Sequence, residues 1–149
     1  MLFSLGQFTF GLQTLPTDQL RRVAAWRHPS SSRVGARPAR QFVGQGDETI
    51  NLSGVLAPEF AGSMRSLDAL RKMADSGKAW ALVSGGNPCE VFGAFVIENL
   101  TETRSVLIDT GAARRIEFDL QLTRVDDERA EPSGGVDPWP VDDYWEWWL

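Results

Sequence analysis

Residues 115–124, RIEFDLQLTR, carry the clearest pattern in this sequence of 149 residues. Apolar and polar side chains alternate without a break, with Ile116, Phe118, Leu120 and Leu122 on one side and Glu117, Asp119, Gln121 and Thr123 on the other. A period of two is typical of a β-strand with one buried and one solvent-exposed face. The stretch therefore predicts a strand whose apolar side lies on a hydrophobic core.

Other segments have a similar character. Strands are expected at Phe3–Leu15, Glu48–Leu56, Ala79–Val83 and Val91–Leu100, and residues 105–108 lead into a turn at Asp109-Thr110-Gly111. The turns between these segments are short and local, so most of the strands should pair antiparallel.

One helix is expected at Arg65–Ser76. Apolar residues recur there at intervals of three and four, which is the helical repeat, and Gly77 suits the left-handed position that ends a helix. Residues 18–27 are interpreted as a short helical or irregular stretch. They lead into an Arg-rich loop at about 27–40, which is expected from its serines, glycine and prolines.

The order of strands, one helix and further strands predicts an α+β, mainly β domain. An antiparallel β-barrel or sandwich with one flanking helix satisfies that order. The periodicity disappears beyond Val125, so residues 126–149 are expected to form an extended acidic tail with a tryptophan-rich end.

Charge is distributed unevenly along the chain. Residues 1–46 have six Arg and one Asp, for a net charge of +5, whereas residues 126–149 have one Arg and eight acids, for −7. The middle of the chain contributes −3, and the whole chain has −5. Opposite charges at the two ends favour pairing between the ends or between copies.

The residue types that catalysis and metal binding need are scarce. The chain has one cysteine, Cys89, and one histidine, His28. Neither a disulfide nor a cysteine-cluster zinc site can therefore form within the chain. His28 lies near three serines, but no nucleophile elbow surrounds them. Glu117 and Asp119 fit the polar face of a strand better than an acid–base pair. We expect no enzymatic activity, no cofactor and no small-molecule substrate. No apolar run reaches the roughly 18 residues of a membrane span, and no signal peptide is recognisable.

The basic stretch indicates an interface. Its members are Arg21, Arg22, Trp26, Arg27, His28, Arg33, Arg37 and Arg40. Arg and Trp are common both in protein interfaces and in nucleic-acid sites. Because an acidic chain repels phosphate and Arg pairs well with carboxylates, protein contact is favoured over nucleic acid.

The C-terminal end is rich in aromatic residues, namely Trp139, Tyr144, Trp145, Trp147 and Trp148. Such side chains are costly to leave in water. Nearby prolines and acids argue against a core strand. The segment is therefore interpreted as a docking segment for another subunit, and folding back on its own domain is the alternative.

Ten short stretches in order along the chain resemble the U-type (GpU) tail protein family of contractile-tailed phages and phage-derived tail particles. They are LGQFTF (5–10), WRHP (26–29), SRVGARP (32–38), QFVG (41–44), LSGVLAPE (52–59), MADSGKAW (73–80), FGAFVI (92–97), ETR (102–104), DTGAARRIEF (109–118) and LTRVDD (122–127). The resemblance covers about residues 2–127, and the rest of the chain lies outside it.

This resemblance implies a structural tail protein without enzymatic activity. It implies a tail-tube-like domain over residues 1–127, followed by an acidic Trp-rich extension over residues 128–149. Six copies would form a ring joining the tail tube to the baseplate hub, in a particle assembled in the host cytoplasm. The alternatives are a head-proximal tail terminator ring, a peripheral baseplate adaptor that binds through the Trp-rich segment, and a nucleic-acid-binding module.

Overall fold

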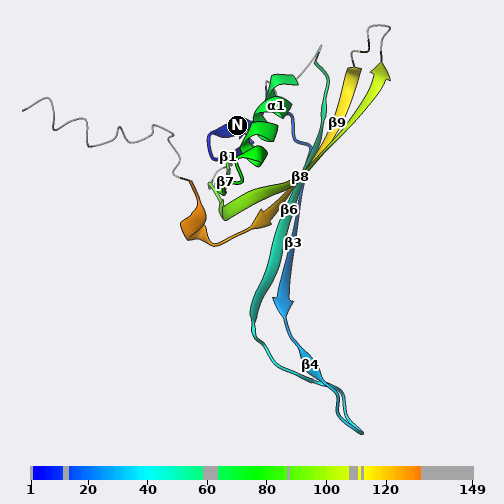
Figure 1. Cartoon of the computed structure of the whole chain (residues 1–149), viewed down its shortest axis with the longest axis vertical. Helices are drawn as coiled ribbons and strands as arrows, with labels where there is room; N and C mark the ends of the chain where they lie inside the picture. The colour runs from blue at the N-terminus through cyan, green and yellow to red at the C-terminus, as the bar shows by residue number, and fades with distance from the viewer. Residues whose placement is uncertain are drawn as a thin grey trace, which may run out of the picture.

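The computed structural model describes residues 2–11, 14–58, 64–86, 88–107, 111 and 113–131. Its elements, in chain order, are β1 (Phe3–Leu5), β2 (Phe8–Phe10), β3 (Gln19–Arg27), β4 (Ser30–Ser31), β5 (Ala39–Arg40), β6 (Gly44–Leu56), α1 (Met64–Asp75), β7 (Trp80–Ser84), β8 (Val91–Leu107), β9 (Ala113–Arg124) and the 3-10 turn η1 (Asp127–Arg129). Seven strands form one sheet in the order β2-β1-β7-β8-β9-β6-β3 (Figure 1).

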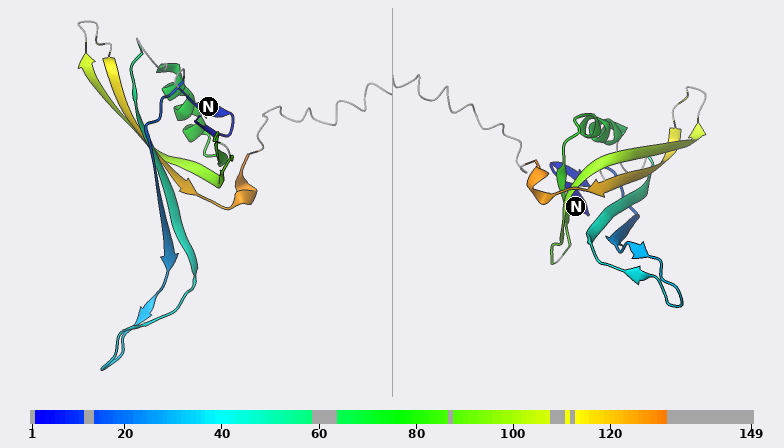
Figure 2. Two further views of the ribbon diagram at one scale, coloured as in Figure 1. Left: turned by 180° about the vertical axis from the view of Figure 1, so that it is seen from behind. Right: turned by 60° about the horizontal axis from the view of Figure 1, so that its bottom comes forward.

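The sheet is open, and this corrects the expected barrel or sandwich. Each strand in the sheet pairs antiparallel with its neighbours, as predicted, but β2 and β3 form two separate edges. β2 has only three residues, whereas β3 has nine and leads away from the body. The two edges therefore do not meet, and a mainly β fold with one helix on one side of the sheet is confirmed (Figure 2).

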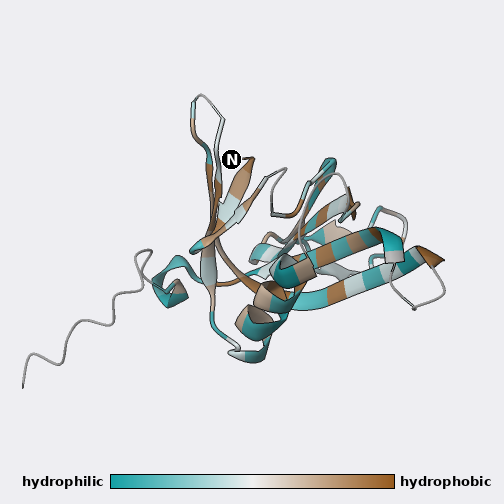
Figure 3. Cartoon of the chain, turned by 90° about the horizontal axis from the view of Figure 1, so that it is seen from above, coloured by the Kyte–Doolittle hydropathy of each residue, from teal (hydrophilic) through white to brown (hydrophobic). Residues whose placement is uncertain are grey.

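The core lies between the sheet and α1. In the central strands Ile50 faces Leu122 and Leu52 faces Leu120, and all four side chains are fully buried. The helix adds Leu67 and Leu70, both buried. The alternation predicted for residues 116–123 is confirmed on its apolar side and appears as alternating bands along the strands in Figure 3.

The helix begins and ends within one residue of its predicted bounds. It runs from Met64 to Asp75, and the Gly77 amide donates to the Ala74 carbonyl at 3.1 Å. Gly77 has φ +68°, the left-handed conformation expected at a helix end.

The N-terminal strand predicted over residues 3–15 is instead a hairpin of β1 and β2. Phe3 pairs with Phe10 and Leu5 with Phe8. Gly6 reverses the chain with φ +59°, a conformation that glycine adopts without steric cost. The period of two is retained on both sides of the turn, which is why it resembled a single strand. Leu12 and Gln13 of the predicted strand lie outside the described residues.

Residues 19–27 form β3, so the expected helical or irregular stretch is wrong. Leu20 pairs with Leu52 and Arg22 with Ile50 along the free side of β6. Nearly all residues of β3 are exposed, so the segment has little apolar periodicity. Backbone pairing with a long neighbouring strand forms it instead.

Strand β8 is longer than the predicted Val91–Leu100 and runs from Val91 to Leu107. Its second half pairs with β9 as far as Leu107 and Ala113, and together they form a second hairpin at one end of the sheet (Figure 1). Asp109 and Thr110 of the expected turn lie outside the described residues.

Gly54 on β6 provides a test of this packing. An added Cβ would lie 2.0 Å from the Pro16 carbonyl oxygen and 2.9 Å from the Phe118 ring. Gly54→Ala should lower the free energy of unfolding by about 3 kcal/mol, because neither the backbone nor a buried ring can move away easily. Chemical denaturation measures the loss. The matched control is Gly86→Ala, whose Cβ would have its nearest neighbour at 3.5 Å and should be almost neutral. Equal stability of the two variants would contradict this packing.

Candidate protein interface

Residues 26–44 form a projecting two-stranded ribbon, here called the arm. Arg27 pairs with Gly44 at its root, and Ser30 pairs with Arg40 farther out. Between these pairs the Gln41 amide donates to the Pro29 carbonyl at 3.1 Å. Within the loop expected at about 27–40, β4 and β5 form a short antiparallel pair, whereas residues 32–38 between them are turn and irregular structure. The whole segment continues β3 and β6 outward (Figure 1).

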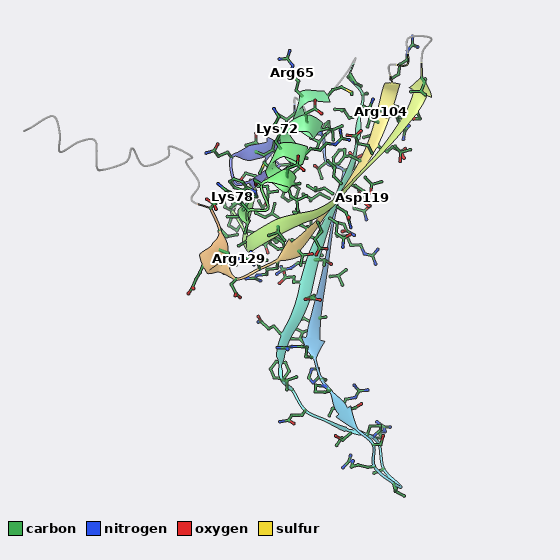
Figure 4. The ribbon with its side chains drawn as sticks, in the orientation of Figure 1. Arg65, Lys72, Lys78, Arg104, Asp119 and Arg129 are labelled. Carbon is green, nitrogen blue, oxygen red and sulfur yellow. The ribbon has the colours of Figure 1, made fainter. Side chains whose placement is uncertain are left out.

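The arm is open to solvent on both faces. Trp26 is 60% exposed, Phe42 59% and Val34, near the tip, fully exposed. Side chains along the arm project to both sides, and no other described segment lies beside them (Figure 4). Exposed apolar groups on a projecting ribbon are typical of a surface that another molecule covers.

Four guanidinium groups lie on the arm, and three of them donate to backbone carbonyls. Arg27 Nε donates to the Gln45 carbonyl at 3.2 Å, Arg33 Nε to the Arg37 carbonyl at 2.9 Å, and Arg40 Nη1 to the His28 carbonyl at 3.4 Å. Within the part of the chain that the structure describes, none of the four, Arg37 included, forms an ion pair with a carboxylate. The arm therefore carries four uncompensated positive charges.

One face of the arm combines aromatic and cationic groups. The His28 and Phe42 rings lie 5.2 Å apart between centroids, and Arg40 bonds the His28 carbonyl. Ser30, opposite Arg40, shares this face because paired residues project to the same side. We call His28, Ser30, Arg40 and Phe42 the aromatic–cationic face.

Arg21 and Arg22 belong to the body and not to the arm, although the basic stretch in the sequence includes them. Arg22 bonds Glu48, and its guanidinium carbon lies 5.6 Å from the centre of the Phe92 ring. Arg21 pairs with Asn51 on β6, so it projects from the opposite face of the sheet. The structure thus separates the predicted cluster into two groups with different surroundings.

An ionic cluster at the root of the arm was missed by the sequence analysis. Glu48 on β6 bonds Arg22 of β3, and Arg124 Nη1 of β9 donates to Glu48 Oε2 at 2.9 Å. The cluster joins three adjacent strands where the arm leaves the body. The sequence does contain an indication of this cluster. Glu48 lies two residues before Ile50 and therefore on the apolar face of its strand, where an acid needs a basic partner.

The environment of Glu48 favours its charged form. Burial opposes ionisation and by itself would raise the pKa of Glu48, whose side chain is only 13% exposed. Hydrogen bonds from Arg124 and Arg22, together with their positive charges, outweigh burial and hold the pKa of Glu48 below its ordinary value of 4.5. The same contact raises the pKa of Arg124. Both groups are therefore charged at neutral pH.

A hollow of about 230 Å³ opens beside this cluster. Trp26 and Glu48 line it together with Ala24, Gln45 and Arg124. The exposed indole of Trp26 thus borders a concave surface at the root of the arm.

The other predicted interface residues, Trp139, Tyr144, Trp145, Trp147 and Trp148, lie outside the described residues. Among the residues that the structure describes, no group of three His, Cys, Asp or Glu side chains is placed to hold a metal ion. No helix in those ranges has the length and apolar character needed to cross a membrane.

Glu48→Gln tests the root cluster. At pH 7 the variant should unfold with a free energy about 2 kcal/mol lower, because a charge-assisted pair is lost. Since the pKa of Glu48 is lowered on folding, its stabilisation is full above pH 4.5 and is lost as the pH falls through the lower folded value. The difference between wild type and variant should therefore shrink in acid, as measured by denaturation between pH 7 and pH 3. Glu117→Gln, at a half-exposed pair with Arg115, is the control with little effect. A difference that stays constant over this pH range would contradict the assignment.

Comparison with known proteins identifies relatives of the chain. A family model described as Phage P2 GpU matches residues 6–127. A probable tape measure protein of Halomonas phage phiHAP-1 is 35% identical over 96 residues, which cover 64% of this chain. The chain spans only 11% of that relative's length.

The family match includes every strand from β2 to β9, the helix, the arm and its ionic root. It also agrees with the short stretches by which the sequence resembles this family. The chain therefore belongs to the phage P2 GpU family, a family of structural proteins of phage tails.

Proposed function

We propose that this protein is a ring subunit of a contractile phage tail or phage-like particle, with six copies joining the tail tube to the baseplate hub. The arm is the observation that carries this proposal. A ribbon with four unpaired Arg and exposed apolar groups has no evident role in folding, because the core lies entirely in the body. It suits a contact between subunits.

The two free sheet edges support assembly into a ring. β2 and β3 are different strands at opposite ends of the sheet, so a contact between them would be head-to-tail and not two-fold. Such contacts generate closed rings when the rotation between copies closes. The copy number of six rests on the tail-tube-like fold that the family resemblance implies. The partial match to a protein named as a probable tape measure protein supports a place in the tail.

The tip of the arm is the natural contact with a neighbouring ring. Arg33 and Arg37 lie on either side of the turn at Gly35, which has φ +74°. They are far along the ribbon from the body and would meet carboxylates of the next ring. In this assignment the partners are other copies of the chain and the tube and baseplate proteins.

One alternative has an observation of its own. The exposed Trp26 beside arm arginines also suits single-stranded nucleic acid, and DNA passes through phage tails. Acids on the outer face of the sheet, Glu117 and Asp119, oppose phosphate binding there. Binding to DNA would favour the nucleic-acid hypothesis over the protein contact if it weakens steeply with salt and is lost in the double variant Arg33→Glu, Arg37→Glu.

Cryo-electron microscopy of the assembled particle tests the ring directly. A six-fold ring continuous with the tube at the baseplate end would support the proposal. A ring at the head end would indicate a tail terminator instead. Separate copies on the baseplate periphery would indicate an adaptor and would overturn the ring.

Charge reversal at the tip gives a biochemical test. The double variant Arg33→Glu, Arg37→Glu should lower the yield of assembled tails by at least about tenfold, because like charges then meet across the contact. Circular dichroism and unfolding of the purified chain should stay unchanged, since both side chains are exposed.

The matched control is Lys72→Glu with Lys78→Glu, which makes the same change in charge. Both lysines lie on the helix side of the body, away from the arm (Figure 4). Normal assembly of the arm variant, or equal losses in the two double variants, would count against a role for the tip.

A further inference from the structure

The arginines of the arm differ from those of the body in their partners. Five body arginines reach carboxylates: Arg22, Arg71, Arg104, Arg115 and Arg124, with contacts such as Arg71 Nη2 to Glu102 Oε1 at 2.6 Å. The four on the arm bond backbone carbonyls or face solvent. A surface on which four guanidinium groups lack acids, in a chain where five body arginines reach them, is complementary to an acidic partner.

No segment of the described chain covers the apolar groups of the arm either. An isolated two-stranded ribbon is only marginally stable in water. The aromatic–cationic face places Phe42 and His28 beside Arg40 and leaves all of them exposed. A segment that brings both carboxylates and aromatic rings would satisfy charge and apolar surface together.

The chain itself contains a segment of that composition. Residues 137–149, DPWPVDDYWEWWL, have four acids, four Trp and one Tyr, and no basic residue. Each feature of the aromatic–cationic face has a complement in this segment.

The described chain ends in a position from which the segment can reach a neighbour. The Glu131 amide donates to the Ala79 carbonyl at 2.8 Å, which anchors this point to the body next to β7. Residues 132–149 could span up to about 60 Å when extended. The arm points away from its own body (Figure 2), which leaves its faces open to a neighbouring copy in the proposed ring.

We infer that residues 137–149 of one copy bind the aromatic–cationic face of the arm of a neighbouring copy. The inference rests on the proposed ring for its geometry. Its acids pair with Arg40, and its tryptophans pack on Phe42 and His28. The tip arginines remain free to contact the next ring, so one arm serves two contacts.

Disulfide trapping in assembled particles tests this contact. All chains carry Cys89→Ser, which removes the exposed native thiol. The test chain adds Ser30→Cys, in the middle of the aromatic–cationic face, and Val141→Cys in the segment. The control chain combines Val141→Cys with Glu98→Cys, an exposed site on β8. Each full-length chain is oxidised and analysed on a non-reducing gel.

A ladder of covalently linked chains from the test pair, and not from the control pair, is the expected result. A cross-linked monomer of altered mobility would show that the segment binds its own arm, and would overturn the inference. Absence of cross-links in particles that do contain a six-fold ring would also overturn it, while leaving the proposed function intact. Absence of the chain from any ring would overturn the proposed function instead.

Binding in solution decides the inference independently of the ring. A fluorescent peptide of residues 136–149 is titrated with the purified full-length chain. Arg40→Glu with Phe42→Ala should weaken binding at least tenfold, and raising salt from 50 to 500 mM should weaken it by a similar factor. Lys72→Glu with Val91→Ala makes matched changes at exposed body positions and should alter affinity less than twofold. Equal binding by the two variants would overturn the inference.

Discussion

The register between β6 and β9 is the constraint on which the rest of the structure depends. It places Leu52 opposite Leu120 and Ile50 opposite Leu122, so the apolar sides of both strands form one continuous surface. A shift of one residue would turn every apolar side chain of a strand to solvent. Helix α1 and the β1–β2 hairpin cover this surface, and Gly54 has no room for a side chain between Pro16 and Phe118.

The same register positions the arm. Because β6 is held in the sheet by β9, its N-terminal half extends beyond the core and carries β3 with it. Glu48 marks the transition, where the apolar face of β6 gives way to a charged contact with Arg22 and Arg124. The cluster connects the edge strand β3 to β6 and β9, and it thereby helps to fix the direction of the arm relative to the core.

The described part of this protein divides into a body with internal partners and an arm with an exposed surface. The body is stabilised by its own core and its own ion pairs, whereas the arm presents exposed aromatic rings and arginines that have no acidic partner in the described chain. This division is typical of a subunit that folds alone and completes its contacts on assembly. Membership of a family of structural phage tail proteins is consistent with it.

The local pattern of apolar and polar residues determined several elements of this protein. The alternation at 116–123, the apolar repeat of the helix and Gly77 at its end each specify an element, because side-chain periodicity reports which face is buried. The exposed arginines and the acidic aromatic segment are also evident from composition. Tertiary structure alone decided that β3 is a strand, that the sheet stays open, and that Arg22 pairs with Glu48. It also decided that Arg33, Arg37 and Arg40 have no acidic partner among the described residues. Those outcomes depend on backbone pairing and on residues distant in sequence, and periodicity carries no information about either.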